Sequence, residues 1–339
     1  MTRLMRKTIL PTVLVLFSCG LRPAWPEGFS RLFQLTYQVR IPAVPPDAQE
    51  LKIWVPLAMS DRNQKILKRE IRTGSPYRLT RDAQYGNDIL FVSLRKPFPP
   101  AIELAVDYEA MVQENHVSLD KARGEVPRGV RHRLEQHLIS NRLMVVDSRI
   151  RQLAQQVTAG SRSPSEKAQA IYHYVIERMR YDKETPGWGK GDTLRACEVG
   201  AGNCTDFHSL FISLARASGI PARFSIGLPV PDQAEGEIPG YHCWAEFYLQ
   251  GIGWVPVDAS EGWKHRERAD YFFGTYDPNR LAVSTGRDIR LVPKPTQRDP
   301  LNIFFFPYVE VDGQALARDQ IQTKFRFRDL AQVESDKHA

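Results

Sequence analysis

Cysteine is scarce in this chain of 339 residues, and the spacing of the cysteines argues against a structural zinc site. The four cysteines are Cys19, Cys197, Cys204 and Cys243. They lack the C-x-x-C pair, followed by a second Cys or His pair, that holds structural zinc. No acidic stretch resembles the calcium-binding loop of an EF-hand. The sequence therefore predicts no metal ion and no organic cofactor.

Three other signatures of function are also missing or incomplete. The G-x-S-x-G nucleophile elbow of serine hydrolases does not occur. The glycine-rich stretch 185–192 (TPGWGKGD) has neither the preceding strand nor the Lys-Ser/Thr ending of a phosphate-binding loop. The net charge of +7 is modest, partly confined to the first seven residues, and elsewhere dispersed among acidic residues. Neither a phosphate site nor a nucleic-acid partner is expected.

No apolar run is long enough to span a bilayer comfortably. Residues 8–17 (TILPTVLVLF) follow a basic start and have the form of an export signal. We predict a signal peptide over residues 1–24 and an exported protein, either periplasmic or lipid-anchored to the cell envelope. The stretch 16–20 (LFSCG) resembles a lipobox, which makes Cys19 a candidate lipidation site and membrane anchor. Ordinary cleavage near residues 22–24 is the alternative, and both stay open.

The chain from residue 30 to 118 has the pattern of an all-β, sandwich-like domain. Four segments alternate apolar with polar residues and are separated by turn-forming Pro, Gly, Asn and Asp. They read FQLTYQVRI, LKIWVPL, DILFVSL and IELAVDYEAMV. The domain contains no cysteine and no cluster of His with carboxylates, so a structural or docking role is expected.

Residues 130–268 combine helical and strand patterns, which predicts an α+β core. Helices are expected over 132–143 and 148–160, and a third helix begins at the capping box Ser163-Pro164-Ser165-Glu166. Strand patterns follow at 222–228, 241–249 and 254–260. Residues 269–339 are expected to form a C-terminal β extension and a polar tail.

Cys204 lies where a thiol can be activated. The stretch 202–211 (GNCTDFHSLF) begins a helix that we expect to run to about residue 218, with Cys204 in its first turn. The partial positive charge of a helix N-terminus stabilises a thiolate and lowers its pKa. The free N–H groups there could also hold a developing oxyanion. Both effects favour a nucleophilic cysteine, whereas neither would benefit a cysteine with a purely structural role.

A base and an orienting carboxylate follow in two adjacent strands. Alternation along 241–249 places His242 on one face and Cys243 on the other, so the two should not serve one site. Asp258 ends the next strand, where it could accept a hydrogen bond from the imidazole. Each residue alone could have a purely structural role: Cys204 as a buried thiol, His242 as a histidine hydrogen-bonded to the backbone, and Asp258 as a turn-forming residue.

Together these segments resemble the transglutaminase-like superfamily, a papain-like group that includes bacterial cysteine peptidases and amidases. The shared pattern is a Cys at a helix start, a following G-I-P-A-R at 219–223, a strand with H-x-W at 242–244, and G-W-x-x-x-D at 253–258. The resemblance extends from Ser163 to Asp258. It implies a papain-like transglutaminase core, with the cysteine-bearing helix packed on an antiparallel sheet.

The resemblance also implies roles for individual residues. Cys204 matches the nucleophile, His242 the base and Asp258 the residue that orients the base. Members of the group commonly place an upstream Trp or Gln near the oxyanion, and Trp188 is the nearest candidate to act there with the Cys204 N–H. The remaining cysteines are then either core residues or a Cys197–Cys243 disulfide, and both readings stay open.

The implied reaction is acyl transfer or hydrolysis at an amide through a thioester. The partner would be a protein or peptide substrate, with the attacked amide in a glutamine side chain or a peptide bond. The sequence does not decide between an amine and water as acceptor, and it makes no prediction of the oligomeric state. The alternative is a non-catalytic binding or assembly protein of the cell envelope that keeps the same fold.

Overall fold

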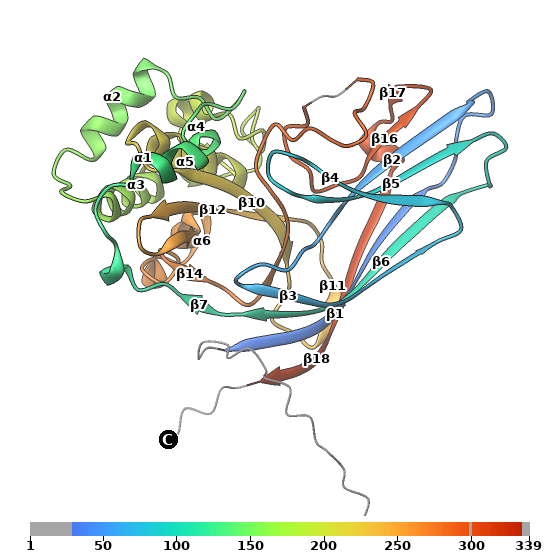
Figure 1. Cartoon of the computed structure of the whole chain (residues 1–339), viewed down its shortest axis with the longest axis horizontal. Coiled ribbons are helices and arrows are strands. Elements are labelled where there is room, and N and C mark those ends of the chain that lie inside the picture. Colours follow the sequence, from blue (N-terminus) through green and yellow to red (C-terminus); the bar gives the residue numbers. More distant parts are fainter. Residues whose placement is uncertain (1–28, 298–299, 334–339) are drawn as a thin grey trace, which may run out of the picture.

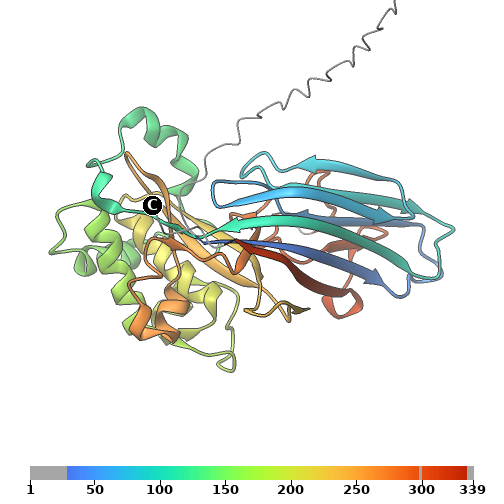
Figure 2. The ribbon, with the colours of Figure 1, turned by 90° about the horizontal axis from the view of Figure 1, so that it is seen from below.

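A computed structural model describes residues 29–297 and 300–333 of the chain, so the predicted signal peptide and Cys19 lie outside the described residues. The described chain forms two lobes, one built of long strands and one that contains the helices (Figures 1 and 2). None of the helices in these ranges is long and apolar enough to cross a membrane.

The strand-rich lobe contains two five-stranded antiparallel sheets. One has the order β11-β18-β1-β6-β3, formed by Glu235–Glu237, Gln322–Val333, Ser30–Ile41, Ile102–Gln113 and Gln64–Thr73. The other has the order β17-β16-β2-β5-β4, formed by Gln314–Ala315, Tyr308–Val311, Glu50–Leu57, Asp88–Arg95 and Tyr77–Arg81. Every second side chain of β1, from Phe33 to Ile41, is buried in a core shared with β2. The alternating pattern thus positions the two sheets against each other.

The C-terminal segment differs from the expected extension and polar tail. β18 pairs with β1 along its whole length, and β16 pairs with β2, so the end of the chain completes the N-terminal sandwich. The polarity of β18 reflects one exposed face, because Phe325 and Phe327 are buried between exposed charged neighbours. Residues 286–293, within the expected β extension, contribute only the isolated bridge between Ile289 and Leu301.

The second lobe has a four-stranded antiparallel sheet with the order β13-β12-β10-β15. These strands are Gly253–Val257, His242–Leu249, Ala222–Pro229 and Arg280–Thr285. The helices are α1 (Arg128–Arg133), α2 (Ser148–Val157), α3 (Pro164–Arg178), α4 (Thr193–Val199), α5 (Cys204–Ala217) and α6 (Ala259–Lys264). Short pairs join β8 (Arg180–Tyr181) to β9 (Ala201–Gly202) and β7 (Asn115–His116) to β14 (Thr275–Tyr276). The α+β class and the strand-rich N-terminal region are confirmed.

Two helix predictions had different outcomes. The capping box of α3 forms as expected, since Ser163 Oγ accepts the Glu166 N–H at 3.2 Å and Glu166 Oε2 accepts the Arg162 N–H at 2.6 Å. The helix expected over 132–143 is wrong, because α1 ends at Arg133 and only a single 3-10 turn follows. Most side chains of this segment are exposed, so a longer helix would have no apolar face to bury.

Gly227 is essential to the sheet beneath the site. It lies on β10 opposite His242, and a Cβ added there would lie 2.0 Å from the carbonyl oxygen of Leu281 on β15. We expect Gly227→Ala to lower the free energy of unfolding by about 3 kcal/mol, measured by urea denaturation, because backbone must move to admit the methyl group. Gly240→Ala is the matched control, since no atom lies within 4 Å of its added Cβ. Equal stability of the two variants would contradict this packing.

Candidate active site

Cys204 is the first residue of α5, the central helix of the second lobe. Every residue of this helix from Cys204 to Arg216 is buried, with α2, α3, α4 and α6 around it and β12 and β10 beneath. The helix is fixed at its start by a capping box: Asn203 Oδ1 accepts the Thr205 N–H at 2.9 Å, and Asp206 Oδ2 accepts the Asn203 N–H at 3.0 Å. The thiol is therefore held by a rigid helix end.

The backbone N–H groups at the start of α5 differ in whether they have a hydrogen-bond acceptor. The Thr205 N–H binds the Asn203 side chain, and the N–H groups of Asp206 and Phe207 bind the Asn203 carbonyl. Within residues 29–297 and 300–333, no acceptor is found for the Cys204 N–H. A donor free at the nucleophile itself could receive the negative charge of a tetrahedral intermediate.

His242 and Asp258 meet where two strands end. β12 pairs with β13 only from Ala245 onward, so His242 extends beyond the end of its neighbour, and Asp258 directly follows β13. In this space His242 Nε2 lies 2.5 Å from Asp258 Oδ2. Nδ1 is the ring nitrogen that this contact leaves free, and His242 lies close enough to the Cys204 thiol to lower the pKa of that thiol. The structure thus brings Cys204, His242 and Asp258 together in that order.

Asp258 is held by a dense set of donors. Its Oδ2 also accepts a hydrogen bond from Arg280 Nη1 at 3.0 Å, and its Oδ1 accepts from Ser260 Oγ and the Glu261 N–H, both at 3.0 Å. These last two bonds cap the N-terminus of α6. The carboxylate is 1% exposed, so its position and orientation are fixed by buried partners.

The charges of this group stabilise one another. Burial alone would lower the pKa of His242, but the charge and hydrogen bond of Asp258, together with Cys204, raise it to about 10. Burial alone would raise the pKa of Asp258, but the charges of His242 and Arg280 hold it well below its usual range. Hydrogen bonds from Cys243 and His242 lower the pKa of Cys204 well below that of a free thiol, against the opposing effect of burial. These shifts favour a thiolate on Cys204 beside an imidazolium on His242.

Cys243 corrects one inference from the sequence. Alternation predicted that His242 and Cys243 could not serve the same site, yet both lower the pKa of the Cys204 thiol. Cys243 faces α5, where its Sγ lies 3.6 Å from Thr205 Oγ1 and 3.8 Å from His208 Nδ1. The alternation rule fails because His242 opens the strand, where no β13 residue confines its ring.

The Cys197–Cys243 disulfide is not formed, and all three described cysteines are free thiols. Cys197 lies on α4 and is partly exposed, with the charge of Arg178 nearby. α4 and β12 both pack against α5, so the central helix separates the two cysteines. Burial raises the pKa of Cys197, in contrast to the lowered pKa of Cys204.

The glycine-rich loop approaches the start of α5 through backbone contacts. Asp206 accepts the N–H groups of Gly189 and Gly191 at 2.7 and 3.0 Å, and both glycines have positive φ angles of 77° and 65°. Trp188 itself is 38% exposed, and no hydrogen bond or ring contact joins it to Cys204 in the part of the chain that the structure describes. The oxyanion role expected for Trp188 stays a prediction.

Asp206 should be the residue that keeps this loop in place. Asp206→Ala leaves three N–H groups, the buried ones of Gly191 and Asn203 and the partly buried one of Gly189, without an acceptor. We expect a loss of about 3 kcal/mol in the free energy of unfolding and faster proteolysis within 186–191. Glu184→Ala, which removes an exposed carboxylate from the same loop, is the control and should change neither. Unchanged proteolysis of Asp206→Ala would show that the loop is held by other contacts.

Three residues of the site were not identified from the sequence. His208 is fully buried, and its Nε2 accepts a hydrogen bond from the Ala259 N–H at 3.0 Å. Because Nε2 is an acceptor in that bond, it does not donate a proton to Asp258 Oδ1, which lies 3.5 Å away. Arg280 lies beside Asp258, and Tyr241 accepts a hydrogen bond from Asn203 Nδ2 at 3.1 Å. The spacing of four between Cys204 and His208 puts both on one helix face and could have indicated the latter. No sequence signal could place Arg280, because it comes from a separate strand.

Comparisons with known proteins identify the fold and the family pattern of the second lobe. Residues 151–259 match the family model described as the Transglutaminase-like superfamily. A protein of Haemophilus influenzae, described only as uncharacterized, is 28% identical over 324 residues, which are 84% of this chain and 86% of that protein. A solved structure from Cytophaga hutchinsonii, described as a candidate cysteine protease, superposes with a TM-score of 0.61 at 14% identity, covering 91% of this chain and 93% of the other. At that identity the likeness shows a shared fold and nothing finer.

Proposed function

Because residues 151–259 belong to the transglutaminase-like superfamily, we propose that the protein is a thiol-dependent enzyme that attacks amides through Cys204. The observation that carries the proposal is the position of His242, between the Cys204 thiol and Asp258 Oδ2, which lies 2.5 Å from its Nε2. A base fixed on one side by a carboxylate and facing a thiol on the other is the arrangement that nucleophilic catalysis requires.

The proposed reaction begins from the thiolate–imidazolium pair. Cys204 Sγ attacks the carbonyl carbon of the amide, and the Cys204 N–H donates a hydrogen bond to the resulting oxyanion. His242 then donates its proton to the departing nitrogen as the C–N bond breaks, which leaves a thioester on Cys204. A primary amine or water attacks the thioester and gives up a proton to His242, and the Cys204 thiolate leaves, which restores the thiolate–imidazolium pair. Asp258 keeps the His242 ring in the required orientation throughout.

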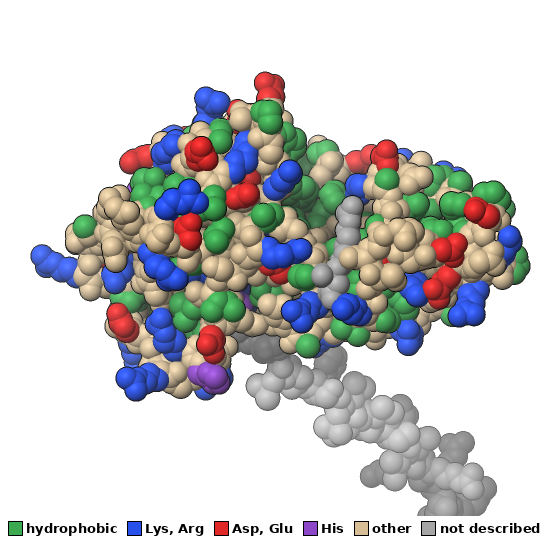
Figure 3. Space-filling model, turned by 90° about the horizontal axis from the view of Figure 1, so that it is seen from above, with side chains coloured by type: hydrophobic (Ala, Val, Ile, Leu, Met, Phe, Trp, Pro, Cys, Tyr) green, Lys and Arg blue, Asp and Glu red, His purple; other side chains and the backbone are tan. Residues whose placement is uncertain are grey.

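We propose that the substrate is a protein or peptide, attacked at a glutamine side chain or a peptide bond. Nucleic acid is not proposed as a partner, since positive and negative side chains are interspersed over the face of the molecule in Figure 3.

The experiment that tests the proposal uses mass spectrometry on a peptide library incubated with the protein and a primary amine. A gain of the amine's mass indicates transamidation, a shift of about one dalton indicates deamidation, and cleavage indicates proteolysis. Cys204→Ser is the matched control, because it keeps the size of the side chain and removes the thiol. If the wild-type protein and this variant give identical product spectra, the proposal fails and a binding or assembly role takes its place.

We also propose that the protein is exported. The support is the basic start followed by the short apolar run at 8–17. Cys19 would then carry the lipid of an envelope anchor. Metabolic labelling with a palmitate analogue, compared between the wild-type protein and Cys19→Ala, tests the anchor. Labelling of neither protein would leave a soluble periplasmic enzyme, and a full-length, uncleaved N-terminus would contradict export.

A further inference from the structure

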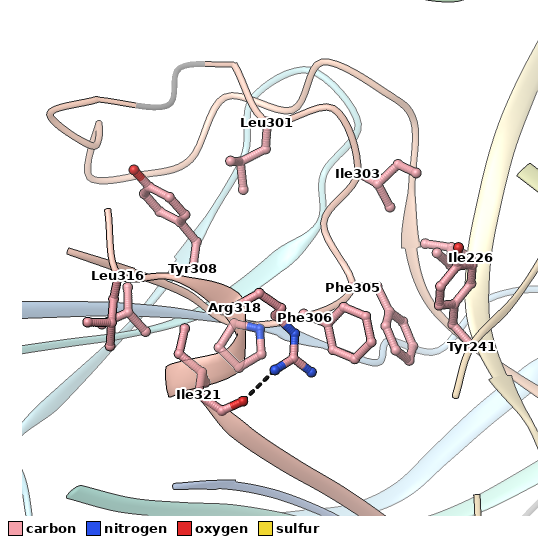
Figure 4. Close-up of a pocket in the computed structure, with 12 residues that line it drawn as sticks. Ile226, Tyr241, Leu301, Ile303, Phe305, Phe306, Tyr308, Leu316, Arg318 and Ile321 are labelled. Carbon is pink, nitrogen blue, oxygen red and sulfur yellow. Dashed lines mark hydrogen bonds between the residues drawn. The ribbon is translucent and has the colours of Figure 1, made fainter. Parts of the chain in front are cut away.

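An apolar cavity of about 320 Å³ lies beside the candidate active site, between the two lobes. From the second lobe, Ile226 and Tyr241 line it, and from the C-terminal part of the chain it is lined mainly by Leu301, Ile303, Phe305, Phe306, Tyr308 and Leu316, with Arg318 at one side (Figure 4). A volume of this size accommodates one large apolar side chain. The mechanism proposed above makes no use of it.

Tyr241 connects the cavity to the thiol. It directly precedes His242, and its hydroxyl accepts a hydrogen bond from Nδ2 of Asn203, the residue that caps the helix of Cys204. The other edge of its ring packs against Phe305 and Phe306, with centroids 5.6 and 6.2 Å apart. One face of this residue therefore belongs to the active site and the other to the cavity wall.

Arg318 gives the cavity a charge. Its guanidinium lies 4.0 Å from the centroid of the Phe306 ring, and it donates to the Ile321 carbonyl and, at 2.7 Å, to Thr323 Oγ1. In residues 29–297 and 300–333 no carboxylate pairs with it, whereas Arg280 in the active site pairs with Asp258. The cavity is thus apolar inside with a free positive charge at its side.

We propose that this cavity is a specificity pocket that binds a large apolar side chain of the substrate, with Arg318 pairing with a nearby substrate carboxylate. The favoured amide is then one that lies close to an aromatic or large aliphatic residue and to an acidic group or a free C-terminus. The role of the pocket in substrate selection rests on the proposed function, because it requires that Cys204 attacks an amide. Binding to the cavity, however, can be measured without turnover.

The binding test uses dansylglycine, which joins an apolar naphthalene ring to a carboxylate, and dansylglycinamide, which lacks the charge. Fluorescence titration is carried out on Cys204→Ala, so that no covalent step occurs. We expect dansylglycine to bind about fivefold more tightly than its amide, as a partly exposed ion pair allows. Arg318→Gln should abolish this preference, and Arg318→Lys should restore part of it.

Two further variants locate the probe. Ile303→Glu places a negative charge in the pocket and should weaken dansylglycine binding at least about tenfold, because the ring loses its apolar surroundings. Ile139→Glu, at an exposed apolar side chain of the second lobe that does not line the cavity, is the matched control and should bind as the parent does. Equal affinity for the acid and the amide, or insensitivity to Ile303→Glu, overturns the proposal.

The link to the thiol is tested by alkylation of Cys204 in the wild-type protein. N-iodoacetyl-phenylalanine should react at least about tenfold faster than N-iodoacetyl-glycinamide, and the advantage should fall in Arg318→Gln. Iodoacetamide reports separately on the reactivity of the thiol itself. A reactive thiol with no gain from the phenylalanine reagent rejects the pocket and keeps the enzyme. An inert thiol rejects the enzyme, and the dansyl titration then decides the pocket alone.

Discussion

Cys204→Ser is expected to lower turnover of the amide substrate by at least about 10⁴-fold while the protein stays folded. A serine hydroxyl is close to a thiol in size, but the charges around it do not ionise it, so no nucleophile is present at neutral pH. His242→Gln should cause a loss of similar size, because the departing nitrogen no longer receives a proton. The double variant should be no worse than either single variant, since the two residues act as one unit.

The control for this prediction is Cys197→Ser. Cys197 is a free thiol on α4 with a raised pKa, and it takes no part in the site. Its replacement should leave kcat and KM unchanged. Turnover that survives in Cys204→Ser, or is lost in Cys197→Ser, would assign the chemistry to another residue.

Asp258→Asn is expected to destabilise the protein by about 3–5 kcal/mol and to reduce the reactivity of Cys204 as well. Arg280 is 5% exposed and its only carboxylate partner within hydrogen-bonding distance in the described chain is Asp258, so the substitution leaves a buried cation unpaired. Without the carboxylate, the pKa of His242 falls from about 10 toward its ordinary value. Less imidazolium is then present at neutral pH, and the thiolate of Cys204 loses its counter-charge.

A double-mutant cycle distinguishes the two parts of this prediction. Arg280→Met combined with Asp258→Asn should cost less stability than the sum of the single changes, because the unpaired cation is removed. The reactivity of Cys204 should stay low in the double variant, since the orienting carboxylate is still missing. Additive losses of stability would contradict a direct interaction between Asp258 and Arg280.

The sequence predicted the parts of the site that depend on local structure. The start of α5 follows from Asn203 and Asp206, whose side chains form the capping box, and the pairing of β12 with β13 follows from the tight turn between them. The positions of Cys204, His242 and Asp258 could be inferred from these elements together with the family pattern. Each depends on contacts between segments that are near one another in the chain.

What could not be predicted depends on contacts between distant segments. β18 was predicted to be part of a polar tail, because nothing in the local sequence indicates that this segment pairs with β1. The two strands lie some 290 residues apart in the chain, and their register joins Ser30 to Val333 and Arg40 to Gln322. The same holds for Arg280 beside Asp258 and for Arg318 at the apolar cavity. The proximity of Cys243 to Cys204 was missed for a different reason, because the sequence does not show that Cys243 faces α5, the helix that Cys204 begins.

The measurement that tests the central claim most directly is the pH profile of iodoacetamide alkylation, followed by mass spectrometry at Cys204 and Cys197 in the same sample. A thiolate held by His242 should keep the Cys204 rate nearly constant from about pH 6 to pH 9. The Cys197 rate should fall about tenfold for each pH unit below its raised pKa, as for an ordinary thiol. If the two cysteines instead show the same pH dependence, Cys204 is not an activated nucleophile and the proposed mechanism is wrong.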